Sequence, residues 1–253
     1  MQLTEPSAPR IAVVTGAARG IGLAIVKALL RDGLQVVGLD VDGDRLTTAL
    51  RDATGTGLPF RGFVADVSSA DDARGAFDRI GALHGGVDVL VNNAGTCFMN
   101  DFLDITPDEL RRQMAINFDS AFYCCQLAIP SMLERPSIKK IVNVSSNGAY
   151  NFEVFDPAHY RTSKAALDTL TKHLARRYAK DGIAVNSVAP AMTRTDLFDV
   201  VPPDVLERAL AGMPRGVAMQ PEEIAAWVAF LVSPAGDCCS GNVIILNQGR
   251  DVR

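Results

Sequence analysis

Tyr160 and Lys164 stand four positions apart, and a serine pair, Ser145-Ser146, ends an apolar run upstream. On a helix this spacing places a phenol and an ammonium on one face, where the cation favours the phenolate. Moving a tyrosine from its ordinary pKa of about 10 to near neutrality requires about 4 kcal/mol. One ammonium about 4 Å away in a partly buried site supplies roughly that much. The pair therefore predicts a group that can take up and release a proton.

A glycine-rich segment, Thr15-Gly16-Ala17-Ala18-Arg19-Gly20-Ile21-Gly22, joins an apolar run to a helical pattern. Glycines at such a place permit a tight turn, close approach of the backbone to a pyrophosphate, and close packing of helix on strand. The spacing Gly-x-x-x-Gly-x-Gly differs from the common Gly-x-Gly-x-x-Gly, so the strand before it and the amphipathic helix after it carry the argument. The segment predicts a dinucleotide site, with a purely structural turn as the alternative.

Asp40 ends the second apolar run about 20 residues after the glycine segment, and we expect it and the adjacent Val41 to contact the cofactor. A carboxylate there accepts a hydrogen bond from a ribose 2′-hydroxyl and repels a 2′-phosphate, which favours NAD over NADP. Arg19 argues the other way if its guanidinium pairs with a 2′-phosphate. Otherwise it is a solvated side chain that caps the loop. We expect NAD.

The elements that must position these residues alternate along the chain as short β-branched runs and longer segments of helical period. This alternation predicts an α/β fold, a single-domain doubly wound (Rossmann) parallel sheet of about seven strands with helices on both faces. The expected strands are 11–15, 35–40, 60–65, 87–91, 138–144, 183–188 and 242–246. The expected helices are 20–31, 69–80, 107–115, 118–133, 157–180 and 221–231. We expect residues 1–9 to be a flexible tail, and residues 191–220 to be either a partly helical substrate flap or a surface excursion.

Composition narrows the function classes. The chain has 253 residues, 48% of them hydrophobic, and a net charge of −4 without a basic run, which disfavours nucleic-acid binding. No stretch approaches a membrane span, so we expect a soluble, cytoplasmic protein. Five cysteines without a Cys-x-x-Cys pattern, and three scattered histidines, favour reduced, buried thiols over disulfides or a metal site.

Together these segments resemble the short-chain dehydrogenase/reductase family over nearly the whole chain. The family motifs occur in order as the glycine segment, Asn92-Asn93-Ala94-Gly95, a serine before Tyr160-x-x-x-Lys164, and Pro190 followed by Thr195. The resemblance implies that the cofactor contacts several sets of residues. These are Gly16, Arg19, Gly20, Ile21 and Gly22 in the glycine segment; Asp66 and Val67 at the adenine; Asn93, Ala94 and Gly95 after the fourth strand; and Pro190, Thr193 and Thr195 near the nicotinamide carboxamide.

The resemblance also implies a mechanism. Ser146 and Tyr160 bind the substrate oxygen next to Asn147, and Tyr160 transfers the proton while a hydride passes between substrate carbon and nicotinamide. Lys164 binds the nicotinamide ribose and lowers the pKa of Tyr160. Asn117 matches the family asparagine that kinks a helix and holds a water next to the lysine.

The resemblance selects Ser146 over Ser145, because the family places its serine second in such a pair. Strand alternation would turn Ser145 to the opposite face. Three features depart from the family pattern: Ser146 lies one residue farther from Tyr160 than is usual, Pro190-Ala191 replaces Pro-Gly, and Asn247-Gln248-Gly249 replaces Asp-Gly-Gly.

Substrate identity should be determined by 96–98, 147–159 and the segment after Thr195. The second of these mixes rings and polar groups, and there is no obvious basic cluster for an acyl-carrier or coenzyme A phosphate. We therefore expect a small free secondary alcohol or ketone, including a sugar or cyclic hydroxy compound. His159 either touches the substrate or is an ordinary residue of the helix start, and we favour the latter.

Two other functions remain open: an NADP-dependent ketone or 3-oxoacyl-acyl-carrier-protein reductase, and a non-catalytic nucleotide-binding redox sensor. The complete set of proton-transfer residues argues against the sensor. The resemblance also suggests a homotetramer or homodimer that packs through 118–133 and 157–180.

Overall fold

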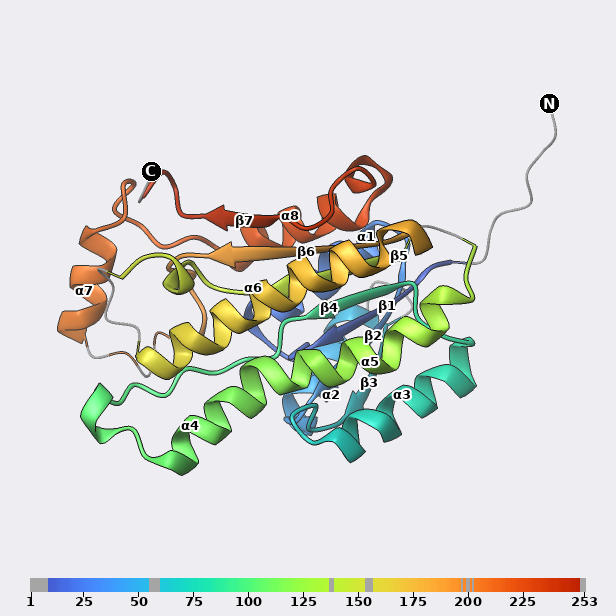
Figure 1. The fold of residues 1–253 in the computed structure, drawn as a ribbon, viewed down its shortest axis with the longest axis horizontal. Helices are drawn as coiled ribbons and strands as arrows, with labels where there is room; N and C mark the ends of the chain where they lie inside the picture. The colour runs from blue at the N-terminus through green and yellow to red at the C-terminus, as the bar shows by residue number, and fades with distance from the viewer. Residues whose placement is uncertain are drawn as a thin grey trace.

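Seven parallel strands form one sheet in the order β3-β2-β1-β4-β5-β6-β7, which confirms the expected doubly wound architecture (Figure 1). The strands are β1 (Ile11–Thr15), β2 (Gln35–Asp40), β3 (Phe60–Val64), β4 (Val89–Asn92), β5 (Lys139–Val144), β6 (Ile183–Pro190) and β7 (Val243–Leu246). The computed structural model describes residues 9–54, 60–136, 139–152, 157–196, 198, 201 and 203–250. Residues 1–8 of the expected flexible tail lie outside this part of the chain.

Helices cover both faces of the sheet. They are α1 (Gly20–Arg31), α2 (Gly43–Thr54), α3 (Ala70–His84), α4 (Pro107–Met114), α5 (Ser120–Leu133), α6 (Ala158–Tyr178), α7 (Pro203–Ala211) and α8 (Pro221–Val232). One hydrophobic cluster lies between the sheet and α1, α2 and α8, and a second lies between the sheet and α3, α5 and α6. Burial on both faces explains why the central strands are almost continuously apolar.

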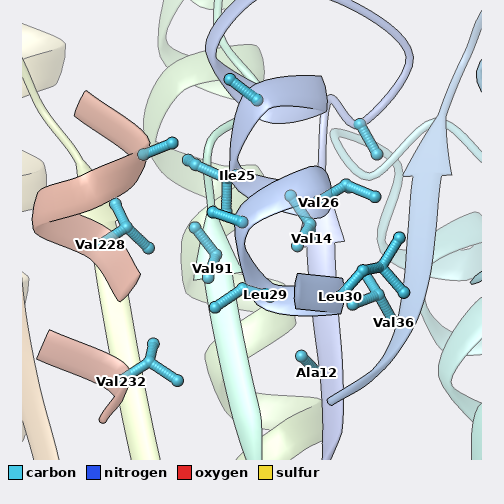
Figure 2. Packing of buried hydrophobic residues seen from close by; sticks show 14 of the residues in the cluster. Ala12, Val14, Ile25, Val26, Leu29, Leu30, Val36, Val91, Val228 and Val232 are labelled. Atoms are coloured by element: carbon cyan, nitrogen blue, oxygen red, sulfur yellow. The ribbon is translucent and has the colours of Figure 1, made fainter. Parts of the chain in front are cut away.

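The helix that follows the glycine segment is fixed firmly on the sheet. Ile25 and Leu29 of α1 are fully buried, beside Val91 of β4 and Val228 of α8 (Figure 2). Full burial of one such aliphatic side chain contributes about 1.5–3 kcal/mol. The start of α1, and with it the glycine segment, therefore has a rigid support.

The chain changes direction across the sheet between β1 and β4. Strand β1 pairs with β2 on one side and with β4 on the other, and Val14 aligns with both Gly38 and Val91. In open α/β sheets, ligands bind beyond the carboxyl ends of the strands at such a switch point. The glycine segment follows β1 and Asn93 follows β4, so both lie at this place.

One helix was missing from the sequence-based expectation. Helix α2 lies between β2 and β3 and buries Leu46, Ala49 and Ala53 on the sheet. These positions are spaced i, i+3 and i+7, which is a helical period. Gly43, Thr47 and Thr48 lower the helix propensity of the segment, and packing on the sheet overrides them.

Several boundaries also differ from expectation. Helix α3 continues through Gly81 and ends at Gly85, whose φ of 71° is left-handed. The two helices expected at 107–115 and 118–133 form one continuous run, joined by a π-helical turn over Ala115–Asp119. Strand β5 begins at Lys139, and Ile138 lies outside the described residues.

The five cysteines are free thiols, but they are not all buried as expected. Cys97, Cys124 and Cys125 are buried, whereas Cys238 is exposed and Cys239 is half-buried. The last two precede β7, which lies at the edge of the sheet. None of the helices in the described ranges is long and apolar enough to cross a membrane.

Candidate active site

The glycine segment forms a tight loop against the end of β4. Gly16 and Gly20 have φ values of 62° and 52°, in the left-handed region that favours glycine. The Asn93 Nδ2 donates to the carbonyl oxygens of Thr15 and Gly16, each at 3.0 Å. The Thr15 hydroxyl accepts from the backbone N–H groups of Asn93 and Ala94, also at 3.0 Å. These bonds hold the two expected cofactor loops together.

Gly22 allows α1 to begin close to this loop. A Cβ at Gly22 would lie 1.9 Å from the carbonyl oxygen of Gly16 and 2.6 Å from the Asn93 Nδ2. The first atom belongs to the backbone, and the Asn93 amide is held by its two hydrogen bonds, so only glycine fits here. The first turn of α1 therefore lies against the loop, and a helix N-terminus is a place where anions bind.

The Gly22→Ala variant is expected to lose about 3 kcal/mol or more of stability, because the added methyl group forces α1 away from the loop. NADH binding should weaken at the same time. Gly75→Ala is the matched control, because a Cβ there meets no atom within 4 Å and Gly75 lies inside α3. That control should gain about 0.5–1 kcal/mol. Thermal unfolding and NADH titration measure both effects, and equal stability of the two variants would contradict the close packing.

Asp40 connects the glycine segment to the turn after β2. Its Oδ2 accepts from the Ala18 N–H at 2.9 Å, and its Oδ1 accepts from the Asp42 N–H at 3.0 Å. The carboxylate is half-buried. It therefore stands at the end of β2 in a fixed orientation, while the side chain of the adjacent Val41 is 65% exposed and points to solvent.

Two arginines, one in the glycine segment and one in α2, are held by a second acid. Asp196, which follows Thr195, pairs with Arg19 at 3.0 Å and with Arg45 at 2.6 Å. Both guanidiniums lower the pKa of Asp196 by hydrogen bonding and charge. Arg19 thus reaches across to the segment after β6 instead of only capping its own loop.

Lys164 is buried on α6, with 4% of its surface exposed. Its Nζ donates to the carbonyl oxygen of Val144, at the end of β5, at 2.9 Å. Burial lowers its pKa to about 8, against the opposing influence of Asp168 and Cys97. Tyr160, half-buried, lies one turn earlier on the same helix, as the spacing predicts.

Asn117 lies in the π-helical turn and is buried. Its Oδ1 accepts from the Thr96 N–H at 2.8 Å, and its Nδ2 donates to the Thr96 carbonyl and to the Ser163 hydroxyl, each at 3.0 Å. A Cβ at Gly95 would lie 3.2 Å from the Lys164 Nζ and 3.4 Å from the Asn117 Oδ1. The structure thus brings Asn117, Gly95 and Lys164 together, and places the expected helix distortion at Asn117.

The two serines after β5 have different partners. The Ser146 Oγ accepts from the Gly148 N–H at 3.0 Å and caps a short 3-10 turn that begins at Asn147. The Ser145 hydroxyl donates to the Asp168 Oδ2 at 2.8 Å and faces α6. The side chain of Ser145 is therefore engaged in the interior.

The remaining expected contacts lie around the same edge of the sheet. Thr193 pairs in a short bridge with Met219, and a Cβ on Gly20 would lie 3.3 Å from the Thr195 Cγ2. Residues 191–220, which follow Pro190, therefore return to the glycine segment, and in their described part they include α7. Figure 1 shows α7 and α4 at the end toward which β6 and β7 point. After β3, Asp66 is exposed and accepts from the backbone and hydroxyl of Ser68, while Val67 is buried.

His159 lies in the first turn of α6, as expected, and it also contacts a second helix. It is 3% exposed, and its Nε2 lies 2.9 Å from the Glu109 Oε1 on α4. Gln113, also on α4, donates to the Thr96 carbonyl at 2.7 Å and accepts from the Phe98 N–H at 3.0 Å. The sequence analysis missed Glu109 and Gln113. The sequence shows only that they are polar and lie on a helix next to the expected substrate loop.

The residues present fit a dinucleotide. Gly22 lets the start of α1 pack directly on the glycine loop, and a fixed carboxylate stands at the end of the neighbouring strand. The glycine segment and Asn93 would hold the pyrophosphate and adenosine side, and Lys164 would contact the nicotinamide ribose. A nicotinamide dinucleotide supplies a hydride donor or acceptor at such a site.

The sequence profile of a family described as enoyl-(acyl carrier protein) reductase matches residues 16–251. The chain belongs to the short-chain dehydrogenase/reductase family. It is an oxidoreductase that acts on substrates of the alcohol or ketone type, with a nicotinamide dinucleotide as cofactor. This result confirms the family resemblance and the fold.

Relatives within the short-chain dehydrogenase/reductase family differ in substrate. The chain is 33% identical to 2,3-dihydroxy-2,3-dihydro-p-cumate dehydrogenase of Pseudomonas putida, over 96% of this chain and 95% of the relative. It is 34% identical to acetoacetyl-CoA reductase of Cupriavidus necator, over 95% and 97% of the two chains. The structure of RhlG from Pseudomonas aeruginosa with NADP in its active site has a TM-score of 0.90 and 30% identity, over 97% of this chain and 98% of that chain.

Proposed function

We propose that the protein transfers a hydride between NAD(H) and a secondary alcohol or ketone, with Tyr160 as the acid and base. The choice of NAD is carried by Asp40, whose carboxylate is fixed at the end of β2 by two backbone N–H groups. A fixed carboxylate accepts from the 2′-hydroxyl of a ribose, whereas a 2′-phosphate at the same place meets like charge.

Each polar residue of the site has a defined task in this proposal. The Tyr160 hydroxyl, as phenolate, takes the proton from the substrate hydroxyl during oxidation and returns it during reduction. The Ser146 hydroxyl donates to the same substrate oxygen and holds it in place. Lys164, as a cation, stabilises the phenolate, and Asn117 fixes the loop that begins at Thr96 next to the lysine.

We propose a small cyclic or polyhydroxylated substrate. In the described part of the segment after β5, Asn147 and Asn151 are buried and Tyr150 is half-buried, next to the exposed ring of Phe152. This mixture of polar groups and a ring suits a hydroxylated ring better than a long acyl chain. The relative from Pseudomonas putida, which by its name acts on a cyclic dihydroxy compound, supports the same class.

A panel of secondary alcohols, cyclic diols and sugars, assayed with NAD and with NADP, tests this function. We expect NADH formation from at least one cyclic diol or hydroxy compound, at a kcat/KM with NAD at least about tenfold above that with NADP. Faster turnover with NADP would overturn the cofactor assignment. Tight NADH binding without turnover of any compound would favour the redox sensor.

Asp40→Asn tests the cofactor assignment at its source. Removal of the charge should shift the ratio of kcat/KM for NAD to that for NADP by about tenfold or more toward NADP, because the repulsion of a 2′-phosphate disappears. Asp44→Asn, in the exposed first turn of α2, changes the net charge equally and should leave the ratio nearly unchanged. An unchanged ratio in Asp40→Asn would show that this carboxylate does not select the cofactor.

The NADP-dependent reductase is the second candidate. The guanidiniums of Arg19 and Arg45 lie together on Asp196, and RhlG, a structural relative, binds NADP. Under our proposal Asp196 offsets the charge of both guanidiniums. Under the alternative, the arginines would leave Asp196 to bind a 2′-phosphate, and Asp40→Asn would change little.

We also propose that the protein forms a homotetramer or homodimer. Helix α5 buries Cys125, Ile129 and Met132 in the core but leaves Phe122 and Leu133 exposed. Trp227 and Phe230 are exposed on α8 and stack edge to face. Such apolar side chains favour contact with a second subunit.

A further inference from the structure

A buried acid lies one helical turn beyond Lys164. Asp168 is 3% exposed, and its Oδ2 accepts from the Ser145 hydroxyl at 2.8 Å and from the Tyr150 hydroxyl at 2.8 Å. Carboxylates are rarely this buried unless charged or polar groups pair with them. The proton-transfer scheme described above gives this acid no task, although it occupies the helix that carries Tyr160 and Lys164.

The two hydroxyl donors come from the segment that carries the proposed substrate contacts. Ser145 immediately precedes Ser146, and Tyr150 ends the 3-10 turn that Ser146 caps. A second bond joins the same segment to α6, from the Arg161 Nη1 to the Gly148 carbonyl at 2.7 Å. The carboxylate of Asp168, on α6, is therefore bonded to the segment that contains Ser146.

We propose that Asp168 is a positioning residue for this reaction: its carboxylate keeps Lys164 in the cationic form and fixes the segment of Ser146 against α6 through Ser145 and Tyr150. This inference deepens the proposed function and rests on it. Under this proposal, the one buried carboxylate both stabilises the charge of Lys164 and holds Ser146 in position.

The charges around Lys164 agree with such a role. Asp168 and Tyr160 lie on its own helix, and Cys97 faces it from the loop after β4. Burial lowers the pKa of Lys164, and Asp168 acts in the opposite direction. Along the helix axis Asp168 lies about 6 Å from Lys164 but about 12 Å from Tyr160, so its charge acts first on the lysine.

Burial raises the pKa of Asp168 above its ordinary value, and the hydroxyls and the charge around it limit this rise. The hydroxyls are those of Tyr150, Ser145 and Ser187, and the charge is that of Lys164. Hydrogen bonds donated to a carboxylate stabilise the anion. In return, burial and the bond to Asp168 raise the pKa of Tyr150, so that hydroxyl stays a donor.

NMR titration of protein labelled with ¹³C at the lysine ε-carbons tests the electrostatic part without any substrate. The Lys164 signal, assigned with Lys164→Met, should titrate near pH 8 in the parent protein. In Asp168→Asn the midpoint should fall by about 1 pH unit or more, because an opposite charge one turn away is lost. Asp168→Glu should restore most of the shift.

The matched control is Asp181→Asn. Asp181 follows the end of α6 and pairs with Arg177 at 3.5 Å, so the variant changes the net charge equally, far along the helix from Lys164. It should leave the Lys164 midpoint unchanged. A similar fall in both variants would assign the effect to net charge and overturn the role of Asp168.

Kinetics test the two parts together. With a substrate from the panel, Asp168→Asn should lower kcat for oxidation about tenfold or more at pH 7 and move the acid limb of the kcat profile to higher pH, while NADH affinity stays within about twofold. A lower melting temperature with an unmoved Lys164 midpoint and an unmoved pH profile would reduce Asp168 to a structural residue.

If Asp168→Asn fails to fold, Tyr150→Phe and Ser145→Ala serve in its place. Each removes a donor to the carboxylate, which then takes up a proton more readily and supports the lysine less. Both should move the Lys164 midpoint down by a smaller amount, and no movement in either would overturn the proposal. Because the titration requires no turnover, it separates a failure of this inference from a failure of the proposed function.

Discussion

Tyr160→Phe is expected to lower kcat about 10²- to 10⁴-fold, because it removes the only atom of the side chain that can carry the proton. The ring remains, so α6 should keep its packing and NADH its affinity. Steady-state kinetics with the best substrate of the panel, together with NADH titration, measure the two effects separately. The loss should appear in kcat and kcat/KM alike, as for an interaction made only in the transition state.

Tyr178→Phe is the matched control for this change. Tyr178 is the last residue of α6, half-buried and stacked by Arg177, five turns from Tyr160. The same loss of a hydroxyl there should leave kcat within about twofold. A Tyr160→Phe variant that keeps a tenth or more of the parent activity would show that another group moves the proton.

Lys164→Met is expected to lower the oxidation rate about 10²- to 10³-fold at pH 7. Without the ammonium, Tyr160 returns toward its ordinary pKa of about 10, so only a small fraction is phenolate near neutrality. The rate should then rise about tenfold per pH unit until that pKa is reached, because the phenolate is the active form. A pH–rate profile of the variant measures both the loss and the recovery.

Lys172→Met provides the control, because Lys172 is exposed two turns further along α6. It should keep both the rate and the pH profile of the parent protein. A Lys164→Met variant whose rate stays low and flat up to pH 10 would mean that the lysine acts by binding the cofactor rather than by its charge on Tyr160.

Local patterns in the sequence predicted most of the fold. The central strands stand out because both faces of the sheet are covered there, so these strands are almost continuous apolar runs. The glycine segment is equally local, since it needs only a turn between a strand and a helix. Helix α2 was missed because its threonines and a glycine lower the helix propensity of the segment. Packing of Leu46 and Ala49 on the sheet stabilises the helix in spite of this.

The supports of the candidate site could not be predicted in the same way. Asp168 contacts Ser145, 23 positions earlier, and His159 contacts Glu109, 50 positions earlier. Neither pair has a sequence signal, because its geometry depends on how α6 lies on β5 and α4. For the same reason, alternation along a strand predicted different sides for Ser145 and Ser146 but gave no indication of the partner of Ser145.

Transfer of deuterium from substrate to cofactor tests the central claim most directly. The protein is incubated with NAD and a secondary alcohol from the panel that carries deuterium on the carbinol carbon. The NADH formed is isolated, and its molecular mass is measured by mass spectrometry. We predict NADH that is heavier by one deuterium in the parent protein, and almost none with Tyr160→Phe. Tight NADH binding with no labelled NADH from any alcohol of the panel would contradict the account.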